Sequence, residues 1–149
     1  MENNMCSSSC KCSSKAWLFY SLAMAVLYFG LDSFFHGYLL KSVYADSAAL
    51  FRPMDQMMAM MKVSYLGYIL FGMLFTFLYS KGYESGKSAV AQGFRFGAFL
   101  GFFYWGVNLL TCYPYLNFPN QIYWAWAGVG IFEFVLLGMI LGMMYKPYK

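Results

Sequence analysis

Residues 122–145 read IYWAWAGVGIFEFVLLGMILGMMY, a continuous apolar run with a single charged side chain, Glu133. An α-helix needs about 20 mainly apolar residues to cross the hydrocarbon core of a bilayer, which is roughly 30 Å thick. The run is long enough for one crossing, and Lys146 and Pro147 end it. This stretch alone predicts a membrane-spanning helix.

The composition of the whole chain agrees with a membrane protein. Of its 149 residues, 61% are hydrophobic and only 11% are charged, whereas soluble domains have about 45–50% apolar and about 25% charged residues. A soluble chain of this length buries only about two-thirds of its surface, so it could not hide so many apolar side chains. The composition excludes a secreted disulfide scaffold, a disordered chain and a typical soluble enzyme. A net charge of +4 also argues against a nucleic-acid binder.

Working outward from residues 122–145, other apolar runs qualify as spans by the same length criterion. They are about residues 16–40, 63–80 and 89–112. These runs are continuously apolar and do not alternate every second residue, which argues against membrane strands. We therefore predict an all-α fold, an integral membrane four-helix bundle over residues 16–149. Residues 1–15 are expected to form a flexible Cys- and Ser-rich cytoplasmic tail.

The Lys and Arg residues of the short loops predict the orientation, because cytoplasmic loops carry an excess of them. With the N-terminus inside, the inner side carries Lys11, Lys15, Lys81, Lys87, Lys146 and Lys149. The outer side carries fewer, namely Lys41, Arg52 and Lys62. Both termini are therefore expected to lie in the cytoplasm.

The outer loop between the first two spans has signals for local helices. Asp46 can cap a short helix that runs to Phe51. Pro53 suits the first turn of the next helix. The second spanning helix is therefore expected to begin near Pro53 and to extend beyond the membrane surface.

Four ionisable residues fall inside the predicted spans, where each costs about 2.5–3.5 kcal/mol at mid-helix and so marks a functional candidate. They are Asp32 and His36 in the first span, Arg95 in the third and Glu133 in the fourth. At 1.5 Å per residue from each inner end, the depths are ~10 Å for Arg95, ~18 Å for Glu133, ~24 Å for Asp32 and ~30 Å for His36.

These depths predict two clusters. The long side chain of Arg95 is expected to reach Glu133 and to form a buried pair with it. Asp32 and His36 are four residues apart, so they share one helix face near the outer boundary and would anchor the outer loop. Asn108 at a similar height in the third span and Arg52 in the loop above complete the set of polar candidates.

Two sharper interpretations stay open. Glu133 could carry a proton or another ion along a path through the bundle, because unpaired intramembrane carboxylates build proton relays. His36 could ligate a metal ion or a porphyrin-type pigment, with Gly37 leaving room for a large ring. Beyond these options no cofactor is predicted.

Two groups of sulfur-containing residues raise a copper hypothesis, because thiolates and thioethers suit Cu(I). Cys6, Cys10 and Cys12 crowd the tail, but three thiolates are one ligand short of a closed zinc site. The methionines Met54, Met57, Met58 and Met61 recur at the spacing of an ordinary packed helix stripe. We predict incidental or lipid-modified cysteines and core methionines, with copper handling as an alternative.

Glycines recur at every fourth position in the last two spans. They are Gly93, Gly97 and Gly101 in the third span, and Gly138 and Gly142 in the fourth. Small residues at this spacing let helix backbones approach closely in lipid. The pattern predicts a tight bundle or a flat face for a second subunit, and it leaves little room for a wide pore.

Several short motifs are distributed along the chain from the first span onward. They are Asp32-x3-His36-Gly37-x-Leu39-Leu40-x3-Tyr44, Phe51-Arg52-Pro53, Met57, Gly67-Tyr68, Lys81-Gly82-Tyr83, Gly93-Phe94-Arg95-Phe96-Gly97, Glu133 and Gly142-x2-Tyr145-Lys146. In these motifs the chain resembles a group of small bacterial four-helix membrane proteins of uncharacterised function. The resemblance does not extend to the Cys-rich tail. It implies a location in the bacterial inner membrane and carries no activity across.

From the sequence, the leading hypothesis is a non-enzymatic protein of the bacterial cytoplasmic membrane that is an accessory or structural subunit of a larger complex, or a homo-oligomer. No nucleophile elbow, phosphate-binding loop or His-Glu zinc helix indicates an enzyme. The expected partners are the bilayer and a membrane protein or a second copy, and no nucleic acid. The alternative is a small proton or ion transporter or channel that uses Asp32, His36, Arg95 and Glu133.

Overall fold

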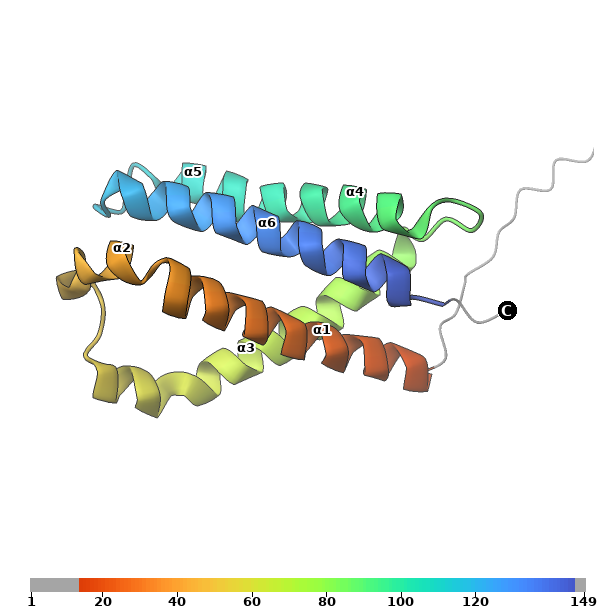
Figure 1. Ribbon diagram of the computed structural model, residues 1–149, viewed down its shortest axis with the longest axis horizontal. Coiled ribbons are helices and arrows are strands. Elements are labelled where there is room, and N and C mark those ends of the chain that lie inside the picture. The colour runs from red at the N-terminus through yellow and green to blue at the C-terminus, as the bar shows by residue number, and fades with distance from the viewer. Residues whose placement is uncertain (1–13, 147–149) are drawn as a thin grey trace, which may run out of the picture.

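The computed structural model describes residues 14–146, which form helices joined by short loops (Figure 1). The elements are α1 (Ser14–Phe34), η1 (Phe35–Leu39), α2 (Lys41–Ala45), η2 (Ala48–Leu50), α3 (Met54–Lys81), α4 (Ala89–Gly101), η3 (Phe102–Val107), α5 (Asn108–Cys112) and α6 (Asn120–Met144). η1 and η3 are π-helical, and η2 is a 3₁₀-helix. Between residues 14 and 146 there is no strand, so the predicted all-α class is confirmed for this part of the chain.

Three helical segments are long and apolar enough to cross a membrane, which marks the chain as a multi-pass membrane protein. They are Ser14–Leu39, which joins α1 and η1, then α3 and α6. α4, η3 and α5 follow one another along residues 89–112 and lie beside α6 (Figure 1). Polar side chains such as Arg95 and Asn108 lower the mean hydropathy of residues 89–112. Length and composition therefore do not identify this segment as a candidate span, unlike the other three.

Local signals explain several helix ends. Pro53 directly precedes α3, and its carbonyl accepts a hydrogen bond from the Met57 amide at 3.0 Å, so the expected start near Pro53 is correct. Ser88 caps α4 by accepting from the Ala91 amide at 3.4 Å. The predicted cap at Asp46 is wrong, because the chain is already helical before this residue and Asp46 ends α2. Of the predicted tail, only Ser14 and Lys15 are described, and both are already helical.

The long helices form two antiparallel pairs, α1 with α3 and α4 with α6, and α1 also contacts α6 (Figure 1). α3 crosses α1 obliquely and diverges from it toward its own N-terminus. The core lies where the pairs meet, with Met24, Phe75, Leu137 and Leu141 almost completely buried. Near the two described chain ends, the Lys146 amide donates to the Tyr20 hydroxyl at 3.2 Å.

Glycines bring α4 and α6 into backbone contact. A Cβ atom on Gly93 would overlap the carbonyl of Gly138, and one on Gly97 would overlap the carbonyl of Phe134. Gly138 and Gly142 are similarly close to backbone carbonyls of the partner helix, and a Cβ atom on Gly101 would lie 2.9 Å from the Cβ atom of Phe134. The predicted packing glycines therefore serve a contact within the chain, and they do not form a free face for a second subunit.

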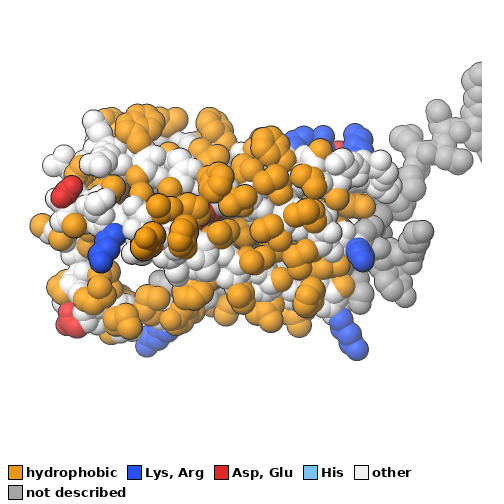
Figure 2. All heavy atoms as spheres, viewed as in Figure 1, with side chains coloured by type: hydrophobic (Ala, Val, Ile, Leu, Met, Phe, Trp, Pro, Cys, Tyr) orange, Lys and Arg blue, Asp and Glu red, His pale blue; other side chains and the backbone are white. Residues whose placement is uncertain are grey.

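The surface is apolar over the middle of the molecule. On the face in Figure 2, hydrophobic side chains cover the central part, and Lys, Arg, Asp and Glu side chains lie mostly toward the two ends. Large apolar side chains such as those of Leu18, Phe99 and Trp124 are exposed. In water so large an apolar surface would be a liability, whereas lipid accommodates it.

The sulfur-containing residues are placed differently from the prediction. Met54, Met57 and Met58 are exposed, and only Met61 of the stripe is half-buried. The predicted core stripe is wrong, because the first turns of α3 diverge from α1 (Figure 1). Cys6, Cys10 and Cys12 lie outside the described residues.

Candidate functional site

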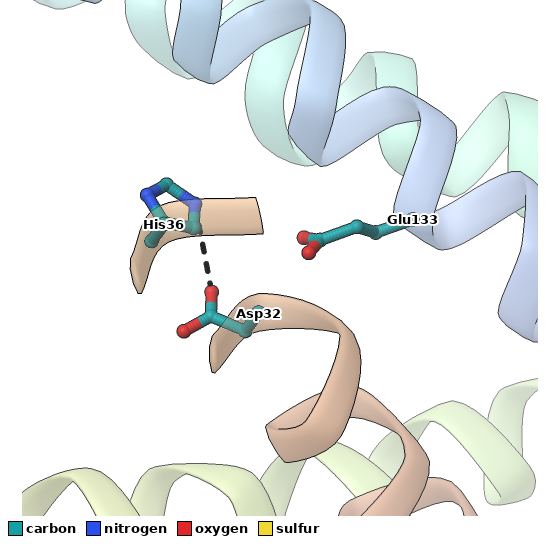
Figure 3. A group of neighbouring side chains, drawn as sticks. All are labelled: Asp32, His36 and Glu133. Atoms are coloured by element: carbon teal, nitrogen blue, oxygen red, sulfur yellow. Dashed lines mark ion pairs between the residues drawn. The ribbon is translucent and has the colours of Figure 1, made fainter. Parts of the chain in front are cut away.

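Three ionisable side chains converge where the end of α1 faces the middle of α6: Asp32, His36 and Glu133 (Figure 3). One oxygen of each carboxylate and one ring nitrogen of the imidazole all lie within 4.8 Å of one another. Asp32 comes from α1, His36 from η1 and Glu133 from α6. The site therefore depends on the contact that joins the two helix pairs.

Asp32 and His36 form the accessible part of this site. The Nε2 atom of His36 lies 3.6 Å from Oδ1 of Asp32. Their i, i+4 spacing puts them on one helix face, as the sequence predicts. The side chains are 24% exposed for Asp32 and 22% for His36, so the site can be reached from the molecular surface.

Glu133 forms the buried part. The residue is 0% exposed, and neither of its carboxylate oxygens has a hydrogen-bond partner. Buried carboxylates are normally paired or hydrogen-bonded, because an isolated charge away from water is very unfavourable. No Lys or Arg within residues 14–146 forms an ion pair with Glu133. Its carboxylate instead points toward Asp32 and His36 (Figure 3), so that two acidic groups and one imidazole face one another.

Three aromatic residues hold the accessible part in position. Tyr68 of α3 donates to Oδ2 of Asp32 at 2.6 Å. The Tyr44 hydroxyl of α2 is hydrogen-bonded to Nδ1 of His36, and Trp126 of α6 donates from Nε1 to the same hydroxyl at 2.7 Å. Burial raises the pKa of Tyr44 above its ordinary value of 10.0, so this hydroxyl keeps its proton at neutral pH. The hydrogen bond on Nδ1 leaves Nε2 of His36 as the nitrogen that faces the carboxylates.

Sequence reasoning did not identify these supporting residues. Tyr44 and Tyr68 belong to the short sequence motifs quoted above, and this is the one signal that the sequence offers for them. Trp126 had no such signal, because aromatic residues are abundant throughout the spans.

Arg95 lies in a different cluster from the predicted one. Its guanidinium donates to Oε1 of Glu84 at 2.6 Å, in the loop between α3 and α4. Lys87 pairs with the other carboxylate oxygen of Glu84. The hydrogen bonds from Lys87 and from Arg95 lower the pKa of Glu84. This cluster lies at the surface, with the Arg95 side chain 63% exposed.

The predicted pair of Arg95 with Glu133 is therefore wrong, and the reason is the direction of the side chain. Gly93 and Gly97 face α6. Arg95 lies two residues from each of them, and at about 100° per residue it points to the opposite side of α4.

The remaining polar candidates do not join the site. Asn108 is exposed on α5, and its side-chain oxygen accepts from the Cys112 thiol at 3.5 Å. Arg52 is exposed in the loop before α3, where it contacts Met60. The observed cluster therefore differs from the one expected near the outer boundary: it does not contain Asn108 or Arg52, and it contains Glu133.

An apolar groove of about 490 Å³ adjoins the site between α3 and the segment of α4 and η3. Tyr28, Tyr68 and Tyr104 line it, and most of the other lining residues are phenylalanines and leucines. Tyr68 borders this groove and also hydrogen-bonds Asp32, so it separates the groove from the polar cluster.

No protein-family model, curated protein or solved structure matches the chain. What the protein does is therefore inferred from its own residues.

Proposed function

We propose that the protein is a small cation transporter of the bacterial cytoplasmic membrane, with Asp32, His36 and Glu133 as its cation-binding groups. One observation carries this proposal: Glu133 is fully buried, has no partner and faces a second acid, Asp32. Two acidic groups in one intramembrane site repel each other unless positive charge neutralises them. A cation bound between the carboxylates would supply that charge.

The proposal includes four spans, formed by α1 with η1, by α3, by α4 with η3 and α5, and by α6, with both termini in the cytoplasm. In support, the first and last described residues lie at the same end of the molecule as the loop between α3 and α4 (Figure 1). Lys15, Lys81, Lys87 and Lys146 also belong to that end, as expected for a cytoplasmic side.

A carrier fits the arrangement better than an open channel. The side chains of Asp32 and His36 are partly exposed, whereas Glu133 lies at the closed end of the site. Glycine packing of α4 against α6 leaves no space for a pore between these helices. The cation would therefore enter between helices, and its passage would require them to move.

Ion flux into vesicles tests the proposal. The full chain is reconstituted in liposomes, and dyes inside the vesicles report protons, alkali ions and divalent metal ions separately. We expect wild-type protein to carry one of these cations, and Glu133→Gln and His36→Ala to abolish the flux. The matched control is Glu84→Gln, the same chemical change in a carboxylate outside the site, which should leave the flux unchanged.

The transport proposal fails if wild-type vesicles carry no cation faster than empty vesicles. It also fails if Glu133→Gln and His36→Ala both transport like wild type.

The accessory-subunit hypothesis is a second candidate, and the apolar groove beside α3 favours it, because a partner could cover that surface. The glycine stripes no longer support it, since they are used within the chain. A native mass measured after gentle extraction tests this candidate: additional polypeptides would support it, and a lone 17.1 kDa chain would remove it.

A further inference from the structure

We propose that the cation is a divalent transition-metal ion such as Mn²⁺, Fe²⁺ or Zn²⁺. Its ligands would be Nε2 of His36 and one carboxylate oxygen each from Asp32 and Glu133. This inference rests on the proposed function, since it names the class of cation that the same site takes.

The distances between the three ligand atoms suit a metal centre. Nitrogen and oxygen ligands that lie about 2.0–2.2 Å from one zinc ion are roughly 3–4 Å apart. Here Nε2 of His36 and Oδ1 of Asp32 are 3.6 Å apart, and one ring nitrogen of His36 and one carboxylate oxygen each from Asp32 and Glu133 all lie within 4.8 Å of one another. A small rotation of the Glu133 side chain would close the remaining gap, and it would break no hydrogen bond, because both oxygens lack partners.

The charges of the site select a divalent ion. Two ionised carboxylates and one doubly charged cation sum to zero, which is the arrangement that a low-dielectric interior tolerates best. A monovalent ion would leave one uncompensated negative charge inside the membrane.

The type of ligand narrows the choice further. Mg²⁺ and Ca²⁺ prefer sites built from oxygen atoms alone, whereas imidazole suits transition metals. Cu(I) prefers sulfur, and none of the three converging residues is a Cys or a Met. The mixed set of one imidazole and two carboxylates therefore indicates Mn²⁺, Fe²⁺ or Zn²⁺. It also argues against a porphyrin, because the free nitrogen of His36 faces two acidic groups.

The surrounding hydrogen bonds have the pattern of a metal centre's outer shell. A metal-bound histidine usually donates its second N–H to a fixed acceptor, and metal-bound carboxylates are hydrogen-bonded in turn. His36 can donate from Nδ1 to the Tyr44 oxygen, which also accepts from Trp126, while Tyr68 donates to Asp32. This arrangement orients Nε2 and one oxygen of Asp32 toward the centre before any ion arrives.

Metal titration of the purified full chain in mild detergent tests the inference. Zn²⁺ binding is measured by calorimetry, and the visible spectrum of bound Co²⁺ reports the ligand set. We expect about one Zn²⁺ per wild-type chain. Glu133→Gln, Asp32→Asn and His36→Ala should each weaken binding about 100-fold or more, beyond the 10–100-fold typical of outer-shell changes. Glu84→Gln is the matched control and should bind Zn²⁺ like wild type.

Two further variants test whether misfolding of the ligand variants, or metal binding by the cysteines of the tail, explains the measured Zn²⁺ binding. Tyr44→Phe keeps all three ligands, and we expect it to weaken Zn²⁺ binding about 10–100-fold by releasing His36. A variant with Cys6, Cys10 and Cys12 all changed to Ser should bind like wild type. Loss of binding in the Cys-to-Ser variant alone, or unchanged binding in all three ligand variants, would overturn the inference.

Binding and flux together separate this inference from the transport proposal. Wild-type protein that binds Zn²⁺ but carries no cation into vesicles would overturn transport and support the metal site. Protein that carries protons or alkali ions but binds neither Zn²⁺ nor Mn²⁺ nor Fe²⁺ would support transport and overturn the metal site.

Discussion

The two helix pairs of this molecule are packed by different means. α4 and α6 meet backbone to backbone at a series of glycines, including Gly93, Gly97 and Gly138. In the pair of α1 and α3, the one glycine with such a contact is Gly72, where a Cβ atom would overlap the Ser21 carbonyl. The glycine pair stays in contact along its length, whereas α3 diverges from α1 (Figure 1).

The pair of α1 and α3 relies on aromatic rings and a polar contact instead. The rings of Tyr28 and Phe71 lie 4.2 Å apart between centroids, and Tyr68 donates to Asp32 at 2.6 Å. Rings hold backbones further apart than glycines do, which leaves space for a groove and for polar groups. The pair of α4 and α6 is therefore closely packed along its length, whereas Asp32 and His36 of the candidate site belong to the segment that packs on α3. Glu133 extends from α6 into that site.

The largest effect is expected from breaking the glycine pair. Gly97→Ala places a Cβ atom on the Phe134 carbonyl, so α4 must move away from α6. We expect a loss of about 3 kcal/mol in the free energy of unfolding, at the upper end of overpacking effects. Denaturant unfolding in detergent measures it.

The control for this change is Gly128→Ala on α6, where a Cβ atom meets nothing within 4 Å. Alanine is the better helix former, so this variant should gain about 0.5–1 kcal/mol. Equal stability of the two variants would contradict the close contact of α4 with α6.

The next largest effect is expected at Glu133, the buried carboxylate that extends from α6 toward α1. In protein freed of metal by a chelator, Glu133→Leu should raise the free energy of unfolding by about 2 kcal/mol, because an apolar side chain replaces a buried unpaired carboxylate. Thermal unfolding followed by circular dichroism measures the change. Excess Zn²⁺ should stabilise wild type but not the variant. A variant less stable than metal-free wild type would show that Glu133 has a stabilising partner.

A smaller effect is expected from the polar contact of the aromatic pair. Tyr68→Phe removes the hydrogen bond to Asp32 and keeps the ring. We expect a loss of about 1–2 kcal/mol, since hydrogen bonds to charged groups contribute about 1.5–3 kcal/mol and Asp32 is partly exposed. Tyr65→Phe is the control, because this neighbouring side chain on α3 is 48% exposed and the change keeps its ring contact with Phe29. Equal losses in both variants would show that the Asp32 contact adds nothing to stability.

The smallest effect concerns the loop that connects the two pairs. Lys87 and Arg95 hold the pKa of Glu84 below its ordinary value of 4.5. A carboxyl group with a lowered pKa in the folded state stabilises the protein above its unfolded pKa, and this contribution is lost as the pH falls through the folded pKa. At neutral pH, Glu84→Gln should therefore melt slightly below wild type. The difference in melting temperature should vanish as the pH drops below 4.5, and a difference that persists in acid would contradict this assignment.

Much of the fold follows from local features of the sequence. Lysines and prolines mark where the apolar runs end, and Pro53 predicts the start of α3 correctly. The glycine spacing predicts close packing in the third and fourth spans, which α4 and α6 show. The methionine stripe fails because periodicity reveals which residues share a helix face, but not how far a neighbouring helix accompanies that face.

The candidate site could be predicted only in part. Spacing alone predicts that Asp32 and His36 lie together, whereas depth in the membrane predicts the wrong partner, Arg95, for Glu133. The depths of ~18 Å for Glu133 and ~24 Å for Asp32 differ by about one helical turn, which a side chain spans easily. Depth carries no information about direction around the helix axis. The glycines beside Arg95 hold that information, because the face that contacts α6 cannot also carry a long cationic side chain.

The π-helical turn η1 fixes the number of residues between His36 and Tyr44. In this turn the Leu40 amide donates to the Phe35 carbonyl at 2.8 Å, so the turn contains one residue more than an α-helical turn. Deleting one residue between these positions would restore an α-helical turn and change the position of His36 relative to the segment that follows. Tyr44 would then leave His36. The segment is a spacer of defined length, which tolerates exchange of its exposed side chains far better than the loss of a single residue.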